Sequence, residues 1–334
     1  MSNSIIFPNK KKISLVNKPY IIAEIGSNFN QNFVKAKKLI LQAKYCGVDA
    51  VKFQLFKSEK LYPDDKKMYK IFKSTELNPK WIPKLKKFAE KCKLDFLCSC
   101  FDLESAKILC NHNLRIHKIA SSEIENYDLS SYLIKTKKPI LLSTGMSDIK
   151  DVKNILKIAK KFKNNKIVIM QCTSMYPLND LDVNLNVLKT YAKFGYVLGF
   201  SDHTLNEVAS LTAVGLGARV FEKHFTLNKK DKGPDHIISI NPKEMKNYVK
   251  KINQAFIQLG SDKKDLVPFE KKFCRRKGVY LSKSLKRGTK IKKNFLKIKA
   301  PAMGLRARDI NSAIGKALKK NVYANKALFL SDVI

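Results

Sequence analysis

Two histidines stand where neighbouring apolar runs give way to polar sequence. His203 follows the run over residues 197–200, and His224 follows the short run over residues 220–221. If these runs are adjacent parallel strands, the two imidazoles emerge side by side at one rim, close enough to share a divalent ion. Such an ion, with coordination positions left open, polarises a carbonyl group as a Lewis acid.

Two lysines in strand-like sequence predict a site for a small anion. Lys52 lies within the apolar run over residues 50–53, and Lys118 follows another such run. A parallel strand that is buried on both faces has no place for a solvated lysine. Two ammonium groups, neighbouring hydroxyls and the backbone at Gly145 would bind a dianion such as a phosphate ester. Carboxylates for hydroxyl groups or protons are available at Glu24, Glu123 and Asp235. These groups predict a metal-assisted condensation between a phosphorylated three-carbon nucleophile and an aldehyde.

Other polar residues have competing interpretations. Asp202 either orients a metal-binding histidine or caps a helix. His117 is expected to be a structural group, and His112, in a polar turn, is expected at the surface. Cys98 and Cys100 could bind a metal, but no second pair stands at zinc-like spacing, so we expect them to fill the core.

The elements that must position these groups alternate along the chain. Eight candidate strands cover residues 20–25, 50–53, 96–98, 116–119, 139–142, 167–170, 196–200 and 219–221. Amphipathic helical patterns lie between them, for example over residues 34–46, 81–91 and 152–162. This alternation predicts a parallel (β/α)₈ TIM barrel, and a doubly wound open sheet is the alternative.

The barrel is expected to close with a helix over residues 242–259, ended by Gly260. We predict a catalytic barrel domain over residues 1–262, a charged linker over 263–277 and a small β-rich domain over 278–334. From residue 271 to 334, 19 Lys and Arg residues stand against 2 Asp. A basic domain of this kind suits a site that binds phosphate and carboxylate groups.

Composition argues against two classes of partner. The 66 Lys and Arg residues outnumber 28 Asp and Glu, a formal charge of +38, but the lysines are spread along the chain without a basic block that has interleaved aromatics. We therefore expect no nucleic-acid partner. No segment reaches the roughly 18 apolar residues of a membrane span, so we expect no membrane partner. The seven scattered cysteines indicate a reducing compartment, and we expect a cytoplasmic protein.

Seven ordered motifs resemble the sialic acid synthase family. They read IAEIGSN, VKFQ, HKIASSE, LSTGM, QCTSMYP, GFSDHT and EKHFT, and begin at residues 22, 51, 117, 142, 171, 199 and 222. The match spans from about residue 20 to the C-terminus. It implies a (β/α)₈ barrel followed by a small antifreeze-like (SAF) domain, in a domain-swapped homodimer where each small domain covers its partner's barrel mouth.

The resemblance also implies an activity, the condensation of phosphoenolpyruvate with the open-chain aldehyde of an N-acetylhexosamine. Enolpyruvate C3 attacks the aldehyde, water adds at C2, and phosphate leaves by C–O cleavage. The positions that match phosphoenolpyruvate ligands are Lys52, Ser99, Lys118, Ser121, Ser143 and Ser201. Those that match sugar-binding residues are Gln54, Glu123, Ser174, Tyr176 and Asp235. The family's catalytic carboxylate matches Glu24, and its histidine ligands for manganese or magnesium match His203 and His224.

The chain departs from the family pattern at three places. Phe29-Asn30-Gln31 replaces a common His-Asn-Gly string beside the site, and Ser99 replaces a threonine. In the small domain, Lys299-Ala300-Pro301 replaces an Arg-Pro string whose arginine reaches the partner's sugar. Lys299, Arg306 or Arg308 could substitute, although lysine does not reproduce the bidentate fork of arginine.

We expect N-acetylmannosamine as acceptor and N-acetylneuraminate, or a close analogue for surface glycans, as product. The string at residues 233–236 favours the N-acetylneuraminate and legionaminate branches. Legionaminate or pseudaminate synthesis from a 2,4-diacetamido-trideoxyhexose is the alternative within the family. Two alternatives belong to other classes: a Schiff-base aldolase with Lys52, Lys118 or Lys223 as nucleophile, and a basic binding protein whose barrel has lost activity.

Overall fold

The computed structural model describes residues 4–273 and 276–334. The chain divides after Gly260 into two compact units, residues 1–260 and 261–334, each with an apolar core of its own. Strands and helices alternate along the larger unit. The smaller unit consists of short strands and 3₁₀ turns after one helix.

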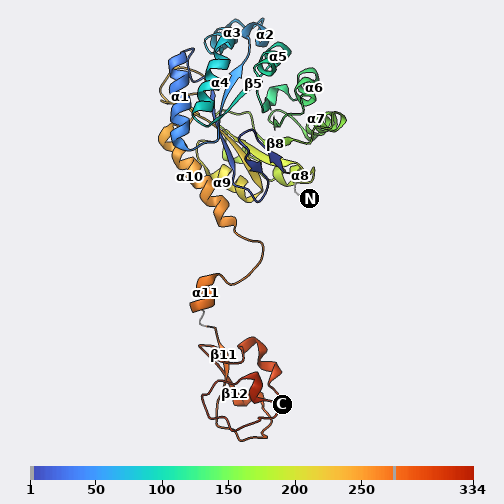
Figure 1. The fold of residues 1–334 in the computed structure, drawn as a ribbon, viewed down its shortest axis with the longest axis vertical. Helices are drawn as coiled ribbons and strands as arrows, with labels where there is room; N and C mark the ends of the chain where they lie inside the picture. Colours follow the sequence, from blue (N-terminus) through green and yellow to red (C-terminus); the bar gives the residue numbers. More distant parts are fainter. Residues whose placement is uncertain (1–3, 274–275) are drawn as a thin grey trace. The chain divides into compact units, whose positions relative to one another are not determined.

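Eight parallel strands close into a barrel in the larger unit (Figure 1). They are β3 (Tyr20–Gly26), β4 (Ala50–Leu55), β5 (Asp95–Cys100), β6 (His117–Ile119), β7 (Ile140–Ser143), β8 (Ile167–Gln171), β9 (Val197–Asp202) and β10 (Ala218–His224). Each predicted strand is present. The barrel closes between the last and first of them, where His224 pairs with Glu24 in register. The predicted (β/α)₈ barrel is confirmed, and the open sheet is excluded.

Side chains alternate between the two faces of each barrel strand, because successive residues of a strand point to opposite sides. On the inner face, Tyr20 and Ile22 lie below Glu24 in β3, and Ala50 lies below Lys52 in β4. The outward residues of the same strands belong to the core shared with the helices. The period of two therefore places polar groups from several strands at one rim, above an apolar floor.

A short antiparallel hairpin, β1 (Ile5–Ile6) and β2 (Lys12–Ile13), precedes the barrel and did not stand out in the sequence. Ile5, Phe7 and Ile13 are buried in the same cluster as the inward residues of the barrel floor. The Phe7 ring packs edge-on against Tyr20, with ring centroids 4.7 Å apart. The hairpin therefore seals the amino-terminal end of the barrel, opposite the polar rim.

Helices surround the barrel (Figure 1). They are α1 (Phe33–Cys46), α2 (Ser58–Leu61), α3 (Lys66–Lys73), α4 (Ile82–Lys91), α5 (Leu103–Asn111), α6 (Tyr127–Lys135), α7 (Ile149–Lys161), α8 (Val187–Ala192), α9 (Val208–Gly215) and α10 (Pro242–Leu259). Helix α10 has the predicted bounds: Asn241 and Glu244 form a capping box at its start, and Gly260, at φ 59°, ends it.

The small unit contains α11 (Pro268–Phe273) and the antiparallel pair β11 (Gly278–Leu281) and β12 (Leu296–Lys299). Its core includes Val279, Leu281, Ile291 and Leu318. The predicted linker over residues 263–277 therefore holds a helix. Glu270 supports the start of this helix, since its carboxylate accepts a hydrogen bond from the Val267 backbone at 3.2 Å.

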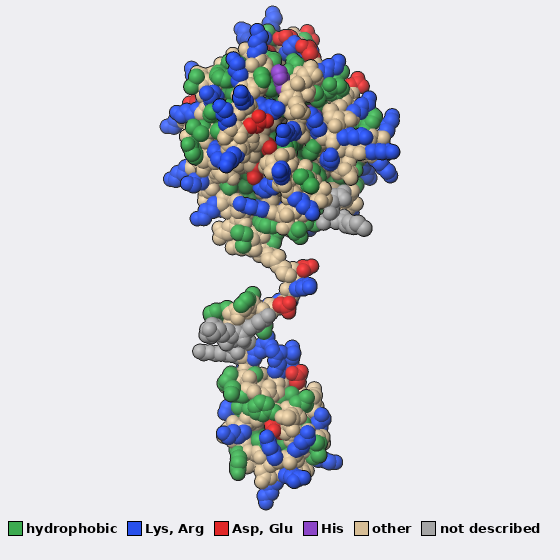
Figure 2. All heavy atoms as spheres, viewed as in Figure 1, with side chains coloured by type: hydrophobic (Ala, Val, Ile, Leu, Met, Phe, Trp, Pro, Cys, Tyr) green, Lys and Arg blue, Asp and Glu red, His purple; other side chains and the backbone are tan. Residues whose placement is uncertain are grey.

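Basic side chains are scattered over the visible face of each unit, with few acidic ones between them (Figure 2). They do not gather there into a single block. Within the described ranges, none of the helices combines the length and apolar character that crossing a bilayer requires.

Candidate active site

A cavity of about 480 Å³ opens where the barrel strands end, and it collects the predicted site residues. Thirteen of the fourteen line it: Glu24, Lys52, Gln54, Ser99, Lys118, Ser121, Ser143, Ser174, Tyr176, Ser201, His203, His224 and Asp235. They come from seven of the eight barrel strands and from the loops that follow the strands; β8 contributes only through its loop, which carries Ser174 and Tyr176. Cys172 and Glu222, which were not among the predicted residues, line the same cavity.

One half of the cavity is built around two buried lysines. The Lys52 ammonium lies 3.0 Å from Glu24 Oε1 and donates to Ser99 Oγ at 2.9 Å. Lys118 Nζ lies 3.4 Å from Glu222 Oε1. Burial disfavours the charged form of both lysines. At Lys52 the nearby carboxylates outweigh the effect of burial and raise the pKa. At Lys118 the effect of burial is larger, and the pKa is lowered.

Glu222 is the carboxylate between the two lysines. Its Oε1 atom lies 3.6 Å from Lys52 Nζ and 3.4 Å from Lys118 Nζ, and it accepts from Ser201 Oγ at 3.1 Å. Burial alone would favour the neutral acid, but the two lysines outweigh it and lower the pKa of Glu222 to about 2. Glu222 thus holds both ammonium groups at the floor of the cavity as a permanent anion.

Glu24 has the opposite character. Burial raises its pKa to about 7, although Lys52 lies beside it and Gln54 Nε2 donates to its Oε1 atom at 2.8 Å. A carboxyl group with this pKa can hold or release a proton near neutral pH. Its second oxygen, Oε2, has no hydrogen-bond partner within the described protein.

The two histidines meet across neighbouring strands, as the sequence predicted. The ring centroids of His203 and His224 are 5.5 Å apart, and the Tyr176 hydroxyl lies 3.3 Å from His203 Nε2. His203 Nδ1 lies 2.8 Å from the Thr173 carbonyl, which fixes the ring and makes Nδ1 the protonated nitrogen. Its Nε2 lone pair is therefore directed toward the cavity.

These imidazoles fit a divalent metal ion. His224 Nδ1 is buried and has no partner within the described protein. Burial lowers the pKa of His224 to about 4, so the ring is a neutral ligand at physiological pH. Among the described residues, no group of three or more His, Cys, Asp or Glu side chains is arranged to hold a metal. The protein would thus supply two nitrogen ligands and leave the other positions to substrate or water.

A corner of hydroxyl groups adjoins the lysines. Ser121 Oγ accepts from the Gly145 backbone at 3.0 Å, and Ser143 Oγ is buried without a partner in the described protein. A Cβ atom at position 145 would lie 2.8 Å from Ser121 Oγ and would also collide with Ser174 Oγ. Glycine at position 145 is therefore required by the packing of these serines, and the contact of its backbone with a bound anion stays a prediction.

The outer wall of the cavity is apolar, and sequence reasoning missed it. Met68, Ile71 and Phe72 of α3 line it together with Phe101 and Met146. The amphipathic pattern of α3 gave no signal, because apolar residues on a helix more often belong to the core.

Three candidate residues of the site lie outside the cavity: Glu123, Asp202 and Lys223. The Glu123 carboxylate accepts from Ser122 Oγ at 2.9 Å and Asn126 Nδ2 at 3.0 Å and does not line the cavity. Asp202 neither touches an imidazole nor caps α9, whose N-cap is Glu207. It lies 3.0 Å from Lys223 Nζ on the outer side of β9 and β10.

Lys223 is buried and paired with Asp202, and it does not line the cavity, because successive residues of β10 point to opposite sides and its neighbours Glu222 and His224 face inward. The suggestion that Lys223 is a Schiff-base nucleophile of this site was therefore wrong. His117 is a structural group as predicted: it is buried near Cys110, and burial lowers its pKa to about 4. Cys98 and Cys100 belong to the apolar core, which confirms that prediction.

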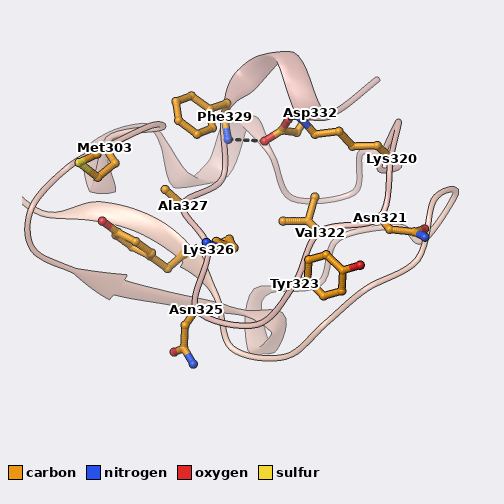
Figure 3. Close-up of a pocket in the computed structure, with 11 residues that line it drawn as sticks. Met303, Lys320, Asn321, Val322, Tyr323, Asn325, Lys326, Ala327, Phe329 and Asp332 are labelled. Atoms are coloured by element: carbon orange, nitrogen blue, oxygen red, sulfur yellow. Dashed lines mark hydrogen bonds and ion pairs between the residues drawn. The ribbon is translucent and has the colours of Figure 1, made fainter.

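The small unit has a hollow of its own, of about 430 Å³ (Figure 3). Met303, Tyr323 and Phe329 lie around it, and Asp332 accepts from the Phe329 backbone at 2.9 Å and pairs with Lys320 at 2.8 Å. None of the predicted catalytic, substrate or metal residues lines this hollow. Arg306 and Arg308 line a different, smaller cleft of about 230 Å³ on the same unit.

The sequence profile of the NeuB family matches residues 39–264, and the profile of the SAF domain matches residues 276–334. N,N'-diacetyllegionaminic acid synthase of Campylobacter jejuni is 36% identical over 91% of this chain and 97% of its own length. The enzyme of the same name from Legionella pneumophila is 34% identical over 94% of both chains.

Among solved structures, the N-acetylneuraminic acid synthetase of Leptospira borgpetersenii superposes with a TM-score of 0.78. It has 30% identity and covers 81% of this chain and 95% of its own. Fold, cavity and sequence agree that this chain belongs to the NeuB family of nonulosonic acid synthases and carries a C-terminal SAF domain.

Proposed function

We propose that the protein condenses phosphoenolpyruvate with an N-acetylhexosamine, such as N-acetylmannosamine, to give N-acetylneuraminate or a close analogue and phosphate. The observation that carries this proposal is the meeting of two buried lysines and two imidazoles in one cavity. The lysines and serines form a site for a phosphorylated carboxylate, and the imidazoles lie beside it. No simpler binding function needs both halves.

In this reaction the C3 carbon of enolpyruvate forms a bond to the aldehyde carbon of the open-chain sugar. Water then adds at C2, and the bond between C2 and the bridging oxygen breaks, so that this oxygen leaves with phosphate. Lys52 and Lys118 bind the negative charge of the nucleophile. Glu24 is the group that receives and returns a proton at the tetrahedral centre, since its pKa lies near neutrality.

His203 and His224 would hold manganese or magnesium, and the bound ion would polarise the aldehyde of the acceptor. Tyr176, whose ring packs against both imidazoles, keeps the two rings in place. Gln54 and Asp235 border the same region and offer hydrogen bonds to sugar hydroxyls.

Phosphate release tests this function directly. We expect release only when phosphoenolpyruvate, Mn²⁺ and N-acetylmannosamine are all present, and loss of release in His224→Ala. His112→Ala, at a partly exposed histidine that does not line the cavity, should leave the rate unchanged. A heavy-oxygen label at the bridging position should appear in phosphate. Release that persists with EDTA, or without any acetamido sugar, would contradict the proposal.

The apolar outer wall favours a second acceptor. Ile71, Phe72 and Met146 offer no partner for the hydroxyl or phosphate at C6 of a hexose, but they suit a methyl group and a second acetamido methyl. Two relatives are named N,N'-diacetyllegionaminic acid synthases. A panel of acetamido and diacetamido-trideoxy hexoses distinguishes the two candidate acceptors. A higher kcat/KM for the trideoxy sugars would assign the protein to the legionaminate or pseudaminate branch.

A Schiff-base aldolase is the rival reaction in the same cavity. Lys118 is its best nucleophile, because burial lowers the pKa of this lysine, whereas carboxylates keep Lys52 protonated. Borohydride treatment with pyruvate should leave the protein mass unchanged under our proposal. A reduced adduct on Lys118, with activity that resists EDTA, would support the aldolase instead.

Assembly and location complete the proposal. We expect a homodimer in which the SAF domains are exchanged, and light scattering of the purified chain measures its molar mass. The six cysteines among the described residues are free thiols, which is typical of proteins from a reducing compartment such as the cytoplasm. Phosphoenolpyruvate and an acetamido sugar would then be its small-molecule partners.

A further inference from the structure

We propose that the loop after the first barrel strand is a latch that positions Asp235, and with it the wall of the cavity that receives the acceptor sugar. The latch consists of Ser27, Asn28, Asn30 and Gln31. This inference rests on the proposed function, because it assigns the latch to the acceptor half of that site. Its residues do not line the cavity themselves.

The latch holds Asp235 at two atoms. Ser27 Oγ donates to the Asp235 carboxylate at 3.0 Å. Asn28 Nδ2 donates to Ser239 Oγ at 2.8 Å, and Ser239 Oγ in turn donates to the Asp235 carbonyl at 2.6 Å. Asn28 and Ser239 are completely buried, so water does not compete for these bonds. The loop after β3 thus holds both the carboxylate and the backbone carbonyl of Asp235, which belongs to the segment after β10.

The segment that carries Asp235 needs such support. It links β10 to α10 without a helix or strand of its own, and most of its residues from 230 to 234 are exposed. Its own backbone offers few constraints, and Gly233 adopts a φ of 148° that suits glycine. Its attachment to the first-strand loop therefore sets where Asp235 stands.

Outer contacts extend the latch to the same segment. His236 Nε2 lies 3.0 Å from Asn30 Oδ1, and Asn30 Nδ2 donates to the Lys232 carbonyl at 2.6 Å. Lys35, at the start of α1, pairs with Asp231 at 2.7 Å. His236 faces this loop and does not line the cavity, in contrast to the two metal-site imidazoles.

The latch also reaches the other side of the acceptor wall. Gln31 Nε2 donates to the Lys73 carbonyl at 2.8 Å, at the end of α3. Helix α3 carries Ile71 and Phe72, which line the cavity. The loop itself is anchored by Phe29, whose buried ring packs against Phe53 with centroids 5.8 Å apart. The Phe-Asn-Gln string thus joins the barrel core to both acceptor-facing segments.

Ser239→Ala tests the latch with the smallest change in packing. We expect the KM for the acceptor to rise on the order of tenfold, from the loss of a buried hydrogen-bond relay. The KM for phosphoenolpyruvate and kcat should stay within about twofold, because the lysine half is untouched. Ser27→Ala should act in the same direction. Ser105→Ala, an equally buried serine that bonds Asp102 at the start of α5, is the matched control.

Hydrogen–deuterium exchange provides a readout that does not need turnover. In Ser239→Ala and Ser27→Ala, amides of residues 228–237 should exchange faster than in wild type, while those of β4 and β6 stay protected. Faster exchange with an unchanged acceptor KM, or equal losses for both substrates, would overturn the proposal. If wild type turns over no acetamido sugar, the proposed function fails, and exchange alone decides whether the latch holds: unchanged exchange refutes it.

Discussion

The two buried carboxylates of the cavity differ in charge, and this difference assigns their roles. The pKa of Glu24 is raised to about 7 by burial, whereas the lysines beside Glu222 lower its pKa to about 2. Of the two carboxylates, Glu24 is the one that exchanges a proton near neutral pH, while Glu222 remains the counter-ion of Lys52 and Lys118. A site that binds an anion and moves a proton needs one group of each kind.

Glu24→Gln should change how stability depends on pH. Because the folded-state pKa of about 7 exceeds the ordinary value of 4.5, the folded protein binds more protons than the unfolded chain between these limits. Glu24 therefore lowers the free energy of unfolding as pH rises through this window. The variant lacks this loss, so its stability relative to wild type should increase with pH.

Urea unfolding of both proteins across this pH window measures the difference, and phosphate release on the same samples measures activity. We expect the variant to lose most activity while it gains relative stability toward pH 7. Parallel stability curves would show that Glu24 is already ionised throughout, which would remove its role as the proton carrier.

Single site residues could be predicted where a polar or charged side chain interrupts an apolar strand. Lys52 and Lys118 interrupt apolar strands, and this alone placed both in the cavity. Glu123 was placed there wrongly, because β6 ends at Ile119 and residues 121–123 form a 3₁₀ turn. With about three residues per turn, Ser121 faces the cavity while Glu123 does not. Ile71 and Phe72 break no such pattern, so nothing in the sequence indicated that they line the cavity.

At the scale of elements, β9 and β10 are held together by a buried ion pair outside the cavity. Lys223 Nζ lies 3.0 Å from Asp202 Oδ2 and also donates to the Thr204 carbonyl. Ser210 of α9 donates to the same carboxylate at 2.7 Å and contacts the Tyr248 hydroxyl of α10. This network fixes the ends of the two strands from which His203 and His224 emerge.

Lys223→Met should destabilise the larger unit strongly. Removal of one partner leaves the Asp202 charge buried and unpaired, which costs about 3–5 kcal/mol in comparable pairs. The free energy of unfolding in urea measures this loss. Adding Asp202→Asn should recover part of it, because the unpaired charge disappears. The Thr204 backbone and hydroxyl also donate to Asp202 Oδ1, at 2.8 and 2.7 Å. A single variant as stable as wild type would mean that these bonds and the one from Ser210 satisfy the carboxylate alone.

The barrel strands could be predicted because parallel strands buried on both faces leave long apolar runs, ended here by the polar rim. The hairpin β1–β2 and helix α11 could not. Each hairpin strand has only two residues, too few to show a period. Helix α11 lies in charged sequence that reads as a linker, and a helix of 6 residues leaves little periodic signal.

At the scale of the whole molecule, the charge of +38 favours anionic substrates over neutral ones. Basic side chains are scattered over the visible surface (Figure 2), and their charge acts through solvent and is screened by salt. The screening length falls from about 10 Å at roughly 0.1 M salt to about 3 Å at roughly 1 M. Contacts buried inside the cavity are screened much less.

The effect of salt can be compared between the two proposed substrates within one enzyme, because phosphoenolpyruvate is a multiply charged anion and the acetamido sugar is neutral. Raising the salt from about 0.1 M to about 1 M should increase the KM for phosphoenolpyruvate several-fold and leave that for the sugar within about twofold. Initial rates with each substrate varied in turn measure both constants, and a non-ionic osmolyte at matched osmolarity controls for effects on water. Equal rises in both constants would point to a salt effect on the fold. No rise in either would mean that Lys52 and Lys118, shielded in the cavity, account for anion binding without help from the surface charge.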